Sequence, residues 1–452
     1  MRFYIETFGC TSNFGDSREL AEALQEMGHI PSRLEEADMV IVNTCAVTER
    51  TERKVLRRLR QLEGDRLLIG GCLAAAMPQS IQSLRCRGRL GPLKEGDATW
   101  ISQLYAGRAV PSRHQQSRHQ QSQHQQFWNQ QSRQLPPQGA HLEQMPFNRR
   151  IGAPLRESSS REDSCGIVNV AEGCAGSCSY CIVSRARGRL KSRPVEDVLL
   201  ATERLVQLGT AEIQISAQDT AAFGSDIGSD LAVLLEALAE IPGDFRLRVG
   251  MMNPDSVKPI QDRLIEAFQS PKIYRFLHIP VQSGSDDVLR YMGRRYSSDE
   301  FLEIVGAFRS AYPEISIITD IIAGFPGETE EDFQESMNLI ERLQPDKVNI
   351  TRFSSRPGTP AASLYDMPDR IKKERSRRMT RLWLRIAERR NSRYLGISLP
   401  ALVTECGSGK TVKARSANYT GIVIPGALDL GSWCRIKITK TNPYYLSGTL
   451  QS

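Results

Sequence analysis

Three closely spaced cysteines carry the clearest chemical signal in this 452-residue chain. The segment GCAGSCSYC sets Cys174, Cys178 and Cys181 in a CxxxCxxC pattern. Three thiolates at this spacing can bind three irons of a cubane, and a [4Fe–4S] cluster then keeps its fourth iron open for another ligand. A structural zinc site needs four closing ligands, usually two CxxC pairs, and no second pair follows nearby. The motif therefore favours an iron–sulfur cluster with an open iron over zinc or a structural loop.

Three further cysteines, Cys10, Cys45 and Cys72, follow the apolar runs RFYIETF, MVIVNTC and LLIGGC. These runs alternate with helical patterns over residues 1–108, which predicts an α/β domain with a βαβαβ parallel sheet. Ligands of such sheets lie beyond the carboxyl ends of the strands, so we expect the three thiols to converge on one site. The alternative is three separate buried cysteines. Cys86 lies off this pattern and is expected to be a structural thiol.

A second region of alternating strands and helices is expected to form the barrel that positions the CxxxCxxC loop. Over residues 159–390, six candidate strands alternate with amphipathic helices, which indicates a partial (βα)6 barrel. Chemistry in such barrels lies at the carboxyl ends of the strands, where the loop follows the first strand. The strands are GIVNVAEG, EIQIS, FRLRVG, YRFLHIP, SIITDII and KVNITRF.

Residues 391–452 switch to short strands with turn signals, which predicts a small all-β barrel of about five strands. Seven basic residues against two acidic ones give this module a charge of +5. A basic β-barrel with aromatic residues is typical of single-stranded RNA recognition by phosphate contacts and stacking. The preceding helix, residues 367–395, is basic and amphipathic, and we expect it to cover the barrel with a solvated face. The candidate stacking residues are Tyr419, Trp433, Tyr444 and Tyr445.

Residues 109–158 are rich in Gln, His and Ser, and the units SRHQQ, SRHQQ, SQHQQ and FWNQQ within them follow one another with a five-residue period. This composition predicts a disordered linker. Histidines 114, 119 and 124 have no fixed geometry there, and we do not expect them to bind metal. No run of about 18 apolar residues occurs, so no membrane span is expected. Ten cysteines in a long chain without a signal segment fit a cytoplasmic protein with metal ligands better than disulfides.

A CxxxCxxC motif that opens a βα barrel resembles the radical S-adenosylmethionine superfamily. The resemblance implies that S-adenosylmethionine chelates the open iron and that an electron from the cluster cleaves it to a 5′-deoxyadenosyl radical. It also implies that Tyr180, before the last cysteine, lines the adenine side. EIQISAQDTAAFG and GFPGET resemble segments that face this cofactor, which makes Gln218 and Gly327 candidate contacts.

From about residue 1 to 108 and from 160 to the end, the chain resembles the methylthiotransferases of that superfamily. GC, NTC and GGC, ending at Cys10, Cys45 and Cys72, match that family's ligands for an auxiliary [4Fe–4S] cluster. HIPVQSGSDDVLRYMGRRY and RPGTPAA match its barrel, and the basic β-barrel resembles its TRAM RNA-binding module. The resemblance implies two clusters, and the division of labour between them implies an apolar, shielded chamber between the first domain and the barrel mouth. No catalytic residue beyond the cluster ligands is identified.

YIETFGCTSNFGDSREL and TRFSSRPGTPAASLYDMPDRIKKERSRR look most similar to the archaeal and eukaryotic threonylcarbamoyladenosine branch. This resemblance implies methylthiolation of N6-threonylcarbamoyladenosine at position 37 of tRNA, with an electron-donor protein as partner and a monomeric enzyme. The alternatives are isopentenyladenosine 37 of tRNA, an aspartate of a ribosomal protein, and an iron–sulfur RNA-binding protein without turnover.

Overall fold

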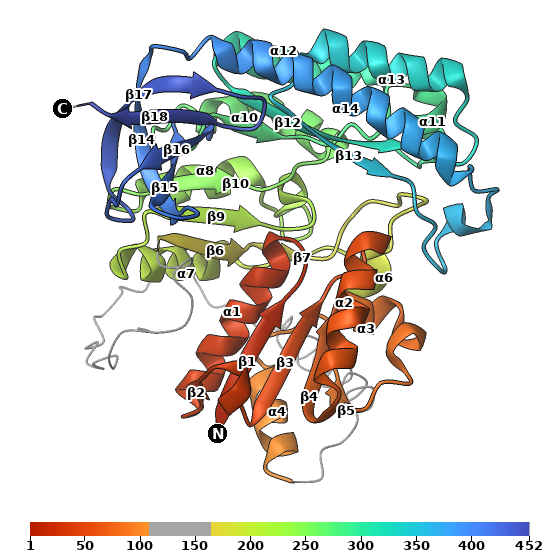
Figure 1. Cartoon of the computed structure of the whole chain (residues 1–452), viewed down its shortest axis with the longest axis vertical. Coiled ribbons are helices and arrows are strands. Elements are labelled where there is room, and N and C mark those ends of the chain that lie inside the picture. The colour runs from red at the N-terminus through yellow and green to blue at the C-terminus, as the bar shows by residue number, and fades with distance from the viewer. Residues whose placement is uncertain (108–163, 452) are drawn as a thin grey trace, which may run out of the picture.

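The computed structural model describes residues 1–107 and 164–451 (Figure 1). The predicted linker, with histidines 114, 119 and 124, lies outside the described residues. Figure 1 shows the first domain beneath the half barrel, and the C-terminal β-barrel at one end of the half barrel. The predicted α/β fold class, with its terminal five-stranded β-barrel, is confirmed. The exact domain boundaries stay predictions.

The first domain is a five-stranded parallel sheet in the order β2-β1-β3-β4-β5. The three predicted strands form its centre, and the edge strands β2 and β5 are too short to carry an apolar pattern. Helices α1 and α4 pack on one face, and α2 and α3 on the other. The elements are β1 (Arg2–Thr7), α1 (Thr11–Glu26), β2 (Ile30–Pro31), β3 (Met39–Thr44), α2 (Glu49–Leu62), β4 (Gly64–Gly71), α3 (Cys72–Ala76), β5 (Cys86–Arg89) and α4 (Asp97–Tyr105).

All six predicted barrel strands are present and run parallel. They form two three-stranded sheets, β6-β9-β10 and β11-β12-β13, which a bridge from Leu247 to Ile273 joins. The strands are β6 (Cys165–Asn169), β9 (Glu212–Ser216), β10 (Arg246–Val249), β11 (Phe276–His278), β12 (Ser316–Ala323) and β13 (Lys347–Arg352).

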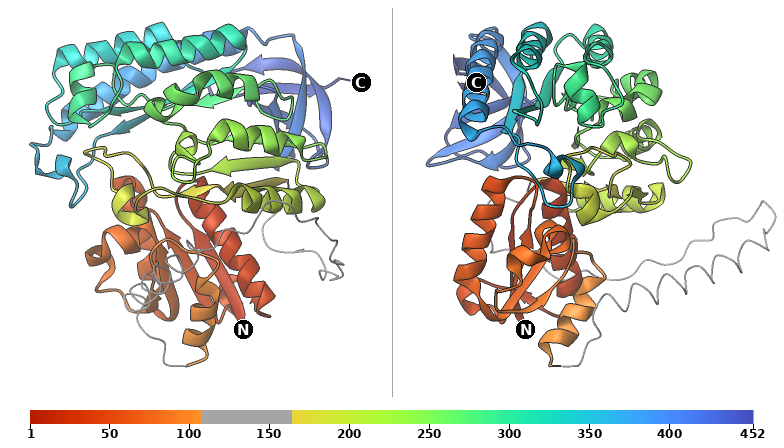
Figure 2. Two further views of the ribbon diagram at one scale, coloured as in Figure 1. Left: turned by 180° about the vertical axis from the view of Figure 1, so that it is seen from behind. Right: turned by 90° about the vertical axis from the view of Figure 1, so that its right-hand side faces the viewer.

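Helices cover the outer face of the half barrel (Figure 2). Outward residues of the strands, such as Leu247, Ile317 and Ile321, pack with these helices in one core. The cysteine loop lies between β7 (Ala171–Glu172) and α6 (Val183–Arg187), and β7 pairs with β8 (Lys191–Ser192). The covering helices are α7 (Val195–Gln207), α8 (Leu231–Glu240), α9 (Pro254–Val257), α10 (Gln261–Ala267), α11 (Asp286–Tyr291), α12 (Ser298–Ala311) and α13 (Glu330–Leu343).

The long basic helix is α14 (Asp369–Ser392), and it covers the barrel as expected. Its buried face carries Met379, Leu382, Trp383 and Ile386, which join the barrel core. The chain then forms a closed barrel in the order β14-β15-β16-β18-β17 around a separate apolar core. Its strands are β14 (Ser398–Cys406), β15 (Thr411–Ser416), β16 (Gly421–Pro425), β17 (Trp433–Thr441) and β18 (Leu446–Leu450).

Tyr419 joins this β-barrel to the amino-terminal end of the half barrel. It lies in the β15–β16 turn with a φ of 64°. Its ring centroid is 4.9 Å from those of Tyr274 and Phe276, and its hydroxyl donates to Glu212 at 2.9 Å. Tyr419 therefore closes the floor of the half barrel, and the prediction that it stacks on RNA is wrong for this docked arrangement.

Candidate active site between the two α/β domains

The CxxxCxxC cysteines lie together on the loop after β7. The backbone N–H of Gly176 donates to Sγ of Cys174 at 3.2 Å, and that of Val183 donates to Sγ of Cys181 at 3.4 Å. A Cβ on Gly176 would lie 3.4 Å from Sγ of Cys174 and 3.7 Å from Sγ of Cys178, so these two sulfurs flank the glycine. Burial raises the pKa of Cys174 to about 11, although the N–H of Gly176 stabilises its thiolate. Ligation of iron would therefore release protons here.

Tyr180 belongs to the cysteine loop, and its side chain contacts residues of the barrel. Its hydroxyl accepts a hydrogen bond from Arg294 at 2.7 Å, and its ring makes an edge contact with Phe325, with centroids 6.3 Å apart. Arg294 also donates to Asn253 at 2.6 Å and forms no ion pair within the described ranges. These contacts fix the ring beside the cluster loop, and its role in binding adenine stays a prediction.

The other two candidate cofactor contacts differ in their setting. Gln218 accepts the backbone N–H of Gly173 at 2.7 Å, while its Nε2 is buried with no partner among the described residues. It therefore braces the loop, and its contact with S-adenosylmethionine stays a prediction. Gly327 is exposed in the turn before α13 with a φ of 86°, and a Cβ there would meet no atom within 4 Å. The turn conformation, not close approach, accounts for this glycine.

The second group of cysteines follows three adjacent parallel strands, as expected. Cys45 and Cys72 come directly after β3 and β4, and Cys10 lies three residues after the end of β1. Burial raises the pKa of Cys72 to about 11, and the charges of Cys10 and Cys45 contribute to this rise. The three thiols are therefore close enough to interact electrostatically. Cys86 begins β5 and packs against the domain core, apart from them.

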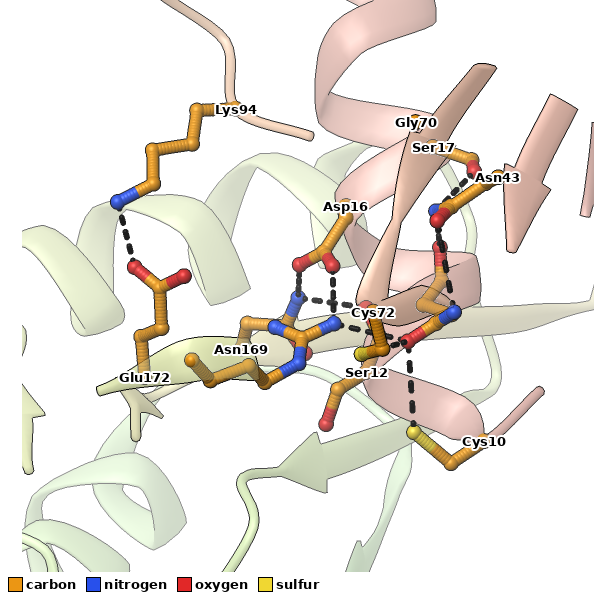
Figure 3. Close-up of polar contacts among 12 residues, drawn as sticks. Cys10, Ser12, Asp16, Ser17, Asn43, Gly70, Cys72, Lys94, Asn169 and Glu172 are labelled. Carbon is orange, nitrogen blue, oxygen red and sulfur yellow. Dashed lines mark hydrogen bonds and ion pairs between the residues drawn. The ribbon is translucent and has the colours of Figure 1, made fainter. Parts of the chain in front are cut away.

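Asn13, which is fully buried, contacts two cysteines of this second group, Cys10 and Cys72. Figure 3 labels both cysteines. Its Nδ2 donates to the backbone oxygens of Phe8 and Thr44 at 2.9 and 3.0 Å, which fixes the amide orientation. Its Oδ1 lies 3.7 Å from Sγ of Cys10 and 3.8 Å from Sγ of Cys72. The two sulfurs therefore share one amide oxygen. The helical pattern missed this residue because α1 begins at Thr11, and the polar first turn shows no apolar periodicity.

Arg187, at the end of α6, connects the two cysteine groups. Its guanidinium donates to Oδ1 of Asn13 at 2.8 Å and pairs with Asp16 at 2.5 Å. Asn169 of β6 donates to the other oxygen of Asp16 at 2.9 Å. Because α6 directly follows the CxxxCxxC loop, one short segment contains the first cysteine group and contacts Asn13 beside the second group. No sequence pattern marked Arg187.

Other polar contacts hold the first domain against the carboxyl ends of the barrel strands. The hydroxyls of Ser12 and Ser216 lie 2.9 Å apart, and Arg356 of the RPGTPAA segment pairs with Glu52 of α2. Ions and hydroxyls therefore form part of this interface. Ile182 and Ala186, which follow the cysteine loop, pack into the apolar core of the first domain beside them. The apolar chamber expected here stays a prediction.

The chemistry of each donor set fits a cubane better than a single ion. Among residues 1–107 and 164–451, no three thiol, imidazole or carboxylate side chains converge closely enough to enclose one metal ion. A cubane instead presents separate irons and needs thiolates that stand apart, one over each iron. Each group offers three thiols, and the assignment of one cluster with an open iron to each group stays a prediction.

The exposed face of β17 and of α14 is basic. Arg435, Lys437 and Lys440 are exposed on β17 and form no ion pair in the described chain, whereas two cations of β15 are paired with Glu405. On α14, four exposed cations repeat at intervals of four residues and form no ion pair within residues 1–107 and 164–451. Such like-charge neighbours destabilise a helix, and an external polyanion would offset this repulsion. The four are Lys373, Arg377, Arg381 and Arg385.

Comparison with known proteins assigns each part of the chain. The models of the Radical SAM superfamily, the Uncharacterized protein family UPF0004 and the TRAM domain match residues 168–340, 2–87 and 392–450. A TRAM match agrees with the predicted module. None of the helices described is long and apolar enough to cross a membrane.

Relatives match the chain from end to end. A "Probable threonylcarbamoyladenosine tRNA methylthiotransferase" of Pyrococcus abyssi is 38% identical and covers 100% of both chains, and a namesake from Archaeoglobus fulgidus is 38% identical over 100% of this chain and 99% of its own. A "tRNA-2-methylthio-N(6)-dimethylallyladenosine synthase" of Thermoanaerobacter sp. is 32% identical over 99% and 92%. The radical S-adenosylmethionine methyltransferase TsrM from Kitasatospora setae shares the fold, with a TM-score of 0.54, 16% identity and coverage of 80% and 74%.

A half barrel with a three-cysteine loop at its carboxyl end defines a radical S-adenosylmethionine enzyme, a class that implies S-adenosylmethionine and a [4Fe–4S] cluster. The added cysteine-bearing sheet and TRAM barrel narrow the class. The chain belongs to the methylthiotransferase family of these enzymes.

Proposed function

We propose that this enzyme transfers a methylthio group to C2 of N6-threonylcarbamoyladenosine at position 37 of tRNA, using two [4Fe–4S] clusters. The observation that carries the proposal is the placement of two three-cysteine groups at carboxyl strand ends that face one domain interface. The full-length relatives that are named for this activity support the choice of substrate.

The proposed roles of the chain's residues follow from where they lie. Cys174, Cys178 and Cys181 would hold the radical cluster, and Cys10, Cys45 and Cys72 the auxiliary cluster. When bound, these groups and S-adenosylmethionine supply the radical that removes hydrogen and the sulfur that is delivered. Tyr180 and Gln218 would position S-adenosylmethionine, with Gly327 a further candidate contact. Arg187 and Asn13 would fix the position of one cysteine group relative to the other.

The basic surfaces of β17 and α14 would bind the tRNA backbone. Exposed Tyr444 and Tyr445 supply rings for stacking next to β17, whereas Trp433 packs beneath the Arg246 guanidinium at 4.4 Å. A basic rather than acidic terminal module also favours RNA over a ribosomal protein as substrate. We further propose a cytoplasmic monomer that receives electrons from a separate donor protein, since the described chain contains no such domain.

Mass spectrometry of tRNA nucleosides from cells with and without the gene tests the substrate. We expect the 2-methylthio derivative of threonylcarbamoyladenosine to disappear without the gene and the unmethylthiolated nucleoside to accumulate. Loss of the dimethylallyl derivative instead would assign the enzyme to the activity for which its 32% identical relatives are named. An unchanged nucleoside profile would favour a ribosomal-protein substrate or a binding protein without turnover.

Point variants test the RNA surface better than removal of the β-barrel, because deletion would also remove Tyr419 and open the barrel floor. Replacing Arg435, Lys437 and Lys440 with Gln is expected to lower tRNA affinity and the slope of affinity against salt concentration. Each cation that binds one phosphate should account for about 0.9 of that slope. Affinity that does not depend on salt would contradict this surface.

A further inference from the structure

Three side chains form a polar strip on the inner wall of the half barrel. Nε2 of His278 lies 3.2 and 3.3 Å from the two carboxylate oxygens of Asp320, and Nδ2 of Asn349 donates to Asp320 at 2.6 Å. These residues come from β11, β12 and β13, which are adjacent strands. We call this group the inner strip. It crosses half of the barrel wall.

The inner strip faces space that solvent can reach. The side chain of Asp320 is 28% exposed and that of His278 is 16% exposed. Their strand neighbours Leu277 and Ile321 point the other way and are fully buried under the outer helices. The exposure of the strip must therefore open into the barrel. Thr351, the next inward position after Asn349 on β13, is exposed as well.

The inner strip lies between the cysteine loop and the closed floor. Ile322, the next inward residue of β12 after Asp320, packs in the cluster that contains Phe325 and Tyr180. Two residues along a strand span roughly 7 Å, so the strip begins one such step from the loop. Tyr419 blocks the opposite end. A base that presents its reacting carbon near the loop can therefore extend a substituent along the wall to the strip.

The inner strip has hydrogen-bonding capacity that the described protein does not use. Oδ1 of Asn349 and the hydroxyl of Thr351 have no partner in residues 1–107 or 164–451. Burial raises the pKa of Asp320, but hydrogen bonds from His278 and Asn349 bring it below its ordinary value, so this carboxylate remains an acceptor. An apolar substituent placed here would cover these groups without supplying hydrogen-bond partners, which disfavours its binding.

We infer that the inner strip binds the substituent on the modified base and selects a hydrogen-bonding, urea-type group over an apolar alkenyl group. Asp320 would accept a urea N–H, while Asn349 and Thr351 would bind its oxygen atoms. This inference rests on the proposed function and names the residues that give it substrate selectivity. A site built around hydrogen bonds discriminates more strongly than an apolar pocket, because the wrong substrate leaves polar groups unsatisfied.

The test uses anticodon stem-loop RNAs that differ only at nucleotide 37, which carries threonylcarbamoyladenosine, isopentenyladenosine or adenosine. Affinity is measured by fluorescence anisotropy and turnover by mass spectrometry, with the full-length, cluster-loaded protein. For Asn349→Leu, we expect Kd and KM for the threonylcarbamoyl RNA to rise about tenfold, which is 1.4 kcal/mol, with kcat almost unchanged. Affinity for the isopentenyl RNA should be equal or higher. Asn338→Leu, on the exposed face of α13, is the matched control.

Thr351→Val is the second variant, because it is nearly isosteric, exposed and harmless to folding. We expect it to shift the ratio of the two affinities in the same direction. If both variants fold and keep the wild-type ratio, the strip does not select the substituent and the inference is overturned. If the wild type gives no product with the threonylcarbamoyl RNA, the proposed function fails instead. The affinity ratios still test whether the inner strip selects the substituent.

Discussion

The two cysteine groups are built in opposite ways. Cys174, Cys178 and Cys181 lie within eight residues on one loop. Backbone N–H groups of the same segment donate hydrogen bonds to two of their sulfurs. The other three lie at the ends of three strands, separated by tens of residues, and depend on sheet register and on Asn13. The first site can therefore form locally, whereas the second exists only in the folded domain. Arg187 follows the loop of the first group and donates to Asn13 beside the second group, so it links the positions of the two groups.

The largest expected effect separates the two groups by partial reaction. Replacing Cys174, Cys178 and Cys181 with Ala should abolish both cleavage of S-adenosylmethionine and product formation. Replacing Cys10, Cys45 and Cys72 should abolish the product while 5′-deoxyadenosine still forms. Chromatography of both products, with iron and sulfide counts, measures this. A triple Ala variant of the second group that still assembled two clusters would disprove that site.

The next effect concerns the link between the groups. Arg187→Met would leave Asp16 as an unpaired carboxylate in a site where both side chains are less than 10% exposed. Breaking such a buried pair costs about 3–5 kcal/mol, measured as the free energy of unfolding in urea. Arg189→Met, on an exposed arginine two residues away, should change stability by less than about 0.5 kcal/mol. Equal effects would mean that the pair does not hold the domains together.

A glycine tests the dependence of the strand-end group on the fold. Gly71 has a φ of 94°, and a Cβ there would lie 2.4 Å from the backbone oxygen of Thr44 and from Oδ1 of Asn43. Gly71→Ala should therefore cost about 3 kcal/mol from strain and overpacking. Its iron content should fall by the share of one cluster. Full iron content would show that this group tolerates a displaced strand end.

The smallest effect is expected at the glycine of the loop group. A Cβ on Gly176 would make only ordinary contacts with Cys174 and Cys178. Gly176→Ala should change the free energy of unfolding by less than about 0.5 kcal/mol and leave the iron content intact. A large loss of iron would mean that the loop is packed as tightly as the sheet edge, and the contrast between the two groups would disappear.

The sequence predicted those features that repeat with a period or occur as a compact motif. Alternation of apolar runs indicated the six barrel strands and the five strands of the TRAM barrel within a few residues. Strand ends indicated the convergence of Cys10, Cys45 and Cys72. In each case the signal was local, or depended on the rule that parallel strands place their ligands at one edge.

The sequence could not predict contacts between elements that are distant in the chain. Asn13, Asp16 and Arg187 are polar residues on helices, which in sequence look like solvent-facing positions. Tyr419 looked like a stacking residue because its neighbours are basic, but its partners lie about 140 residues or more earlier in the chain. The polar inner strip was missed because the outward residues of β11 and β12 supply the apolar signal of those strands.

The closed floor of the half barrel has a consequence for the proposed RNA surface. Tyr419 docks the TRAM barrel directly onto the barrel strands, so that surface is joined to the half barrel that carries the cysteine loop. If the proposed function holds, this joint would set the distance between a bound phosphate and the cysteine loop. The enzyme would then select the nucleotide at one spacing along the RNA over identical bases elsewhere.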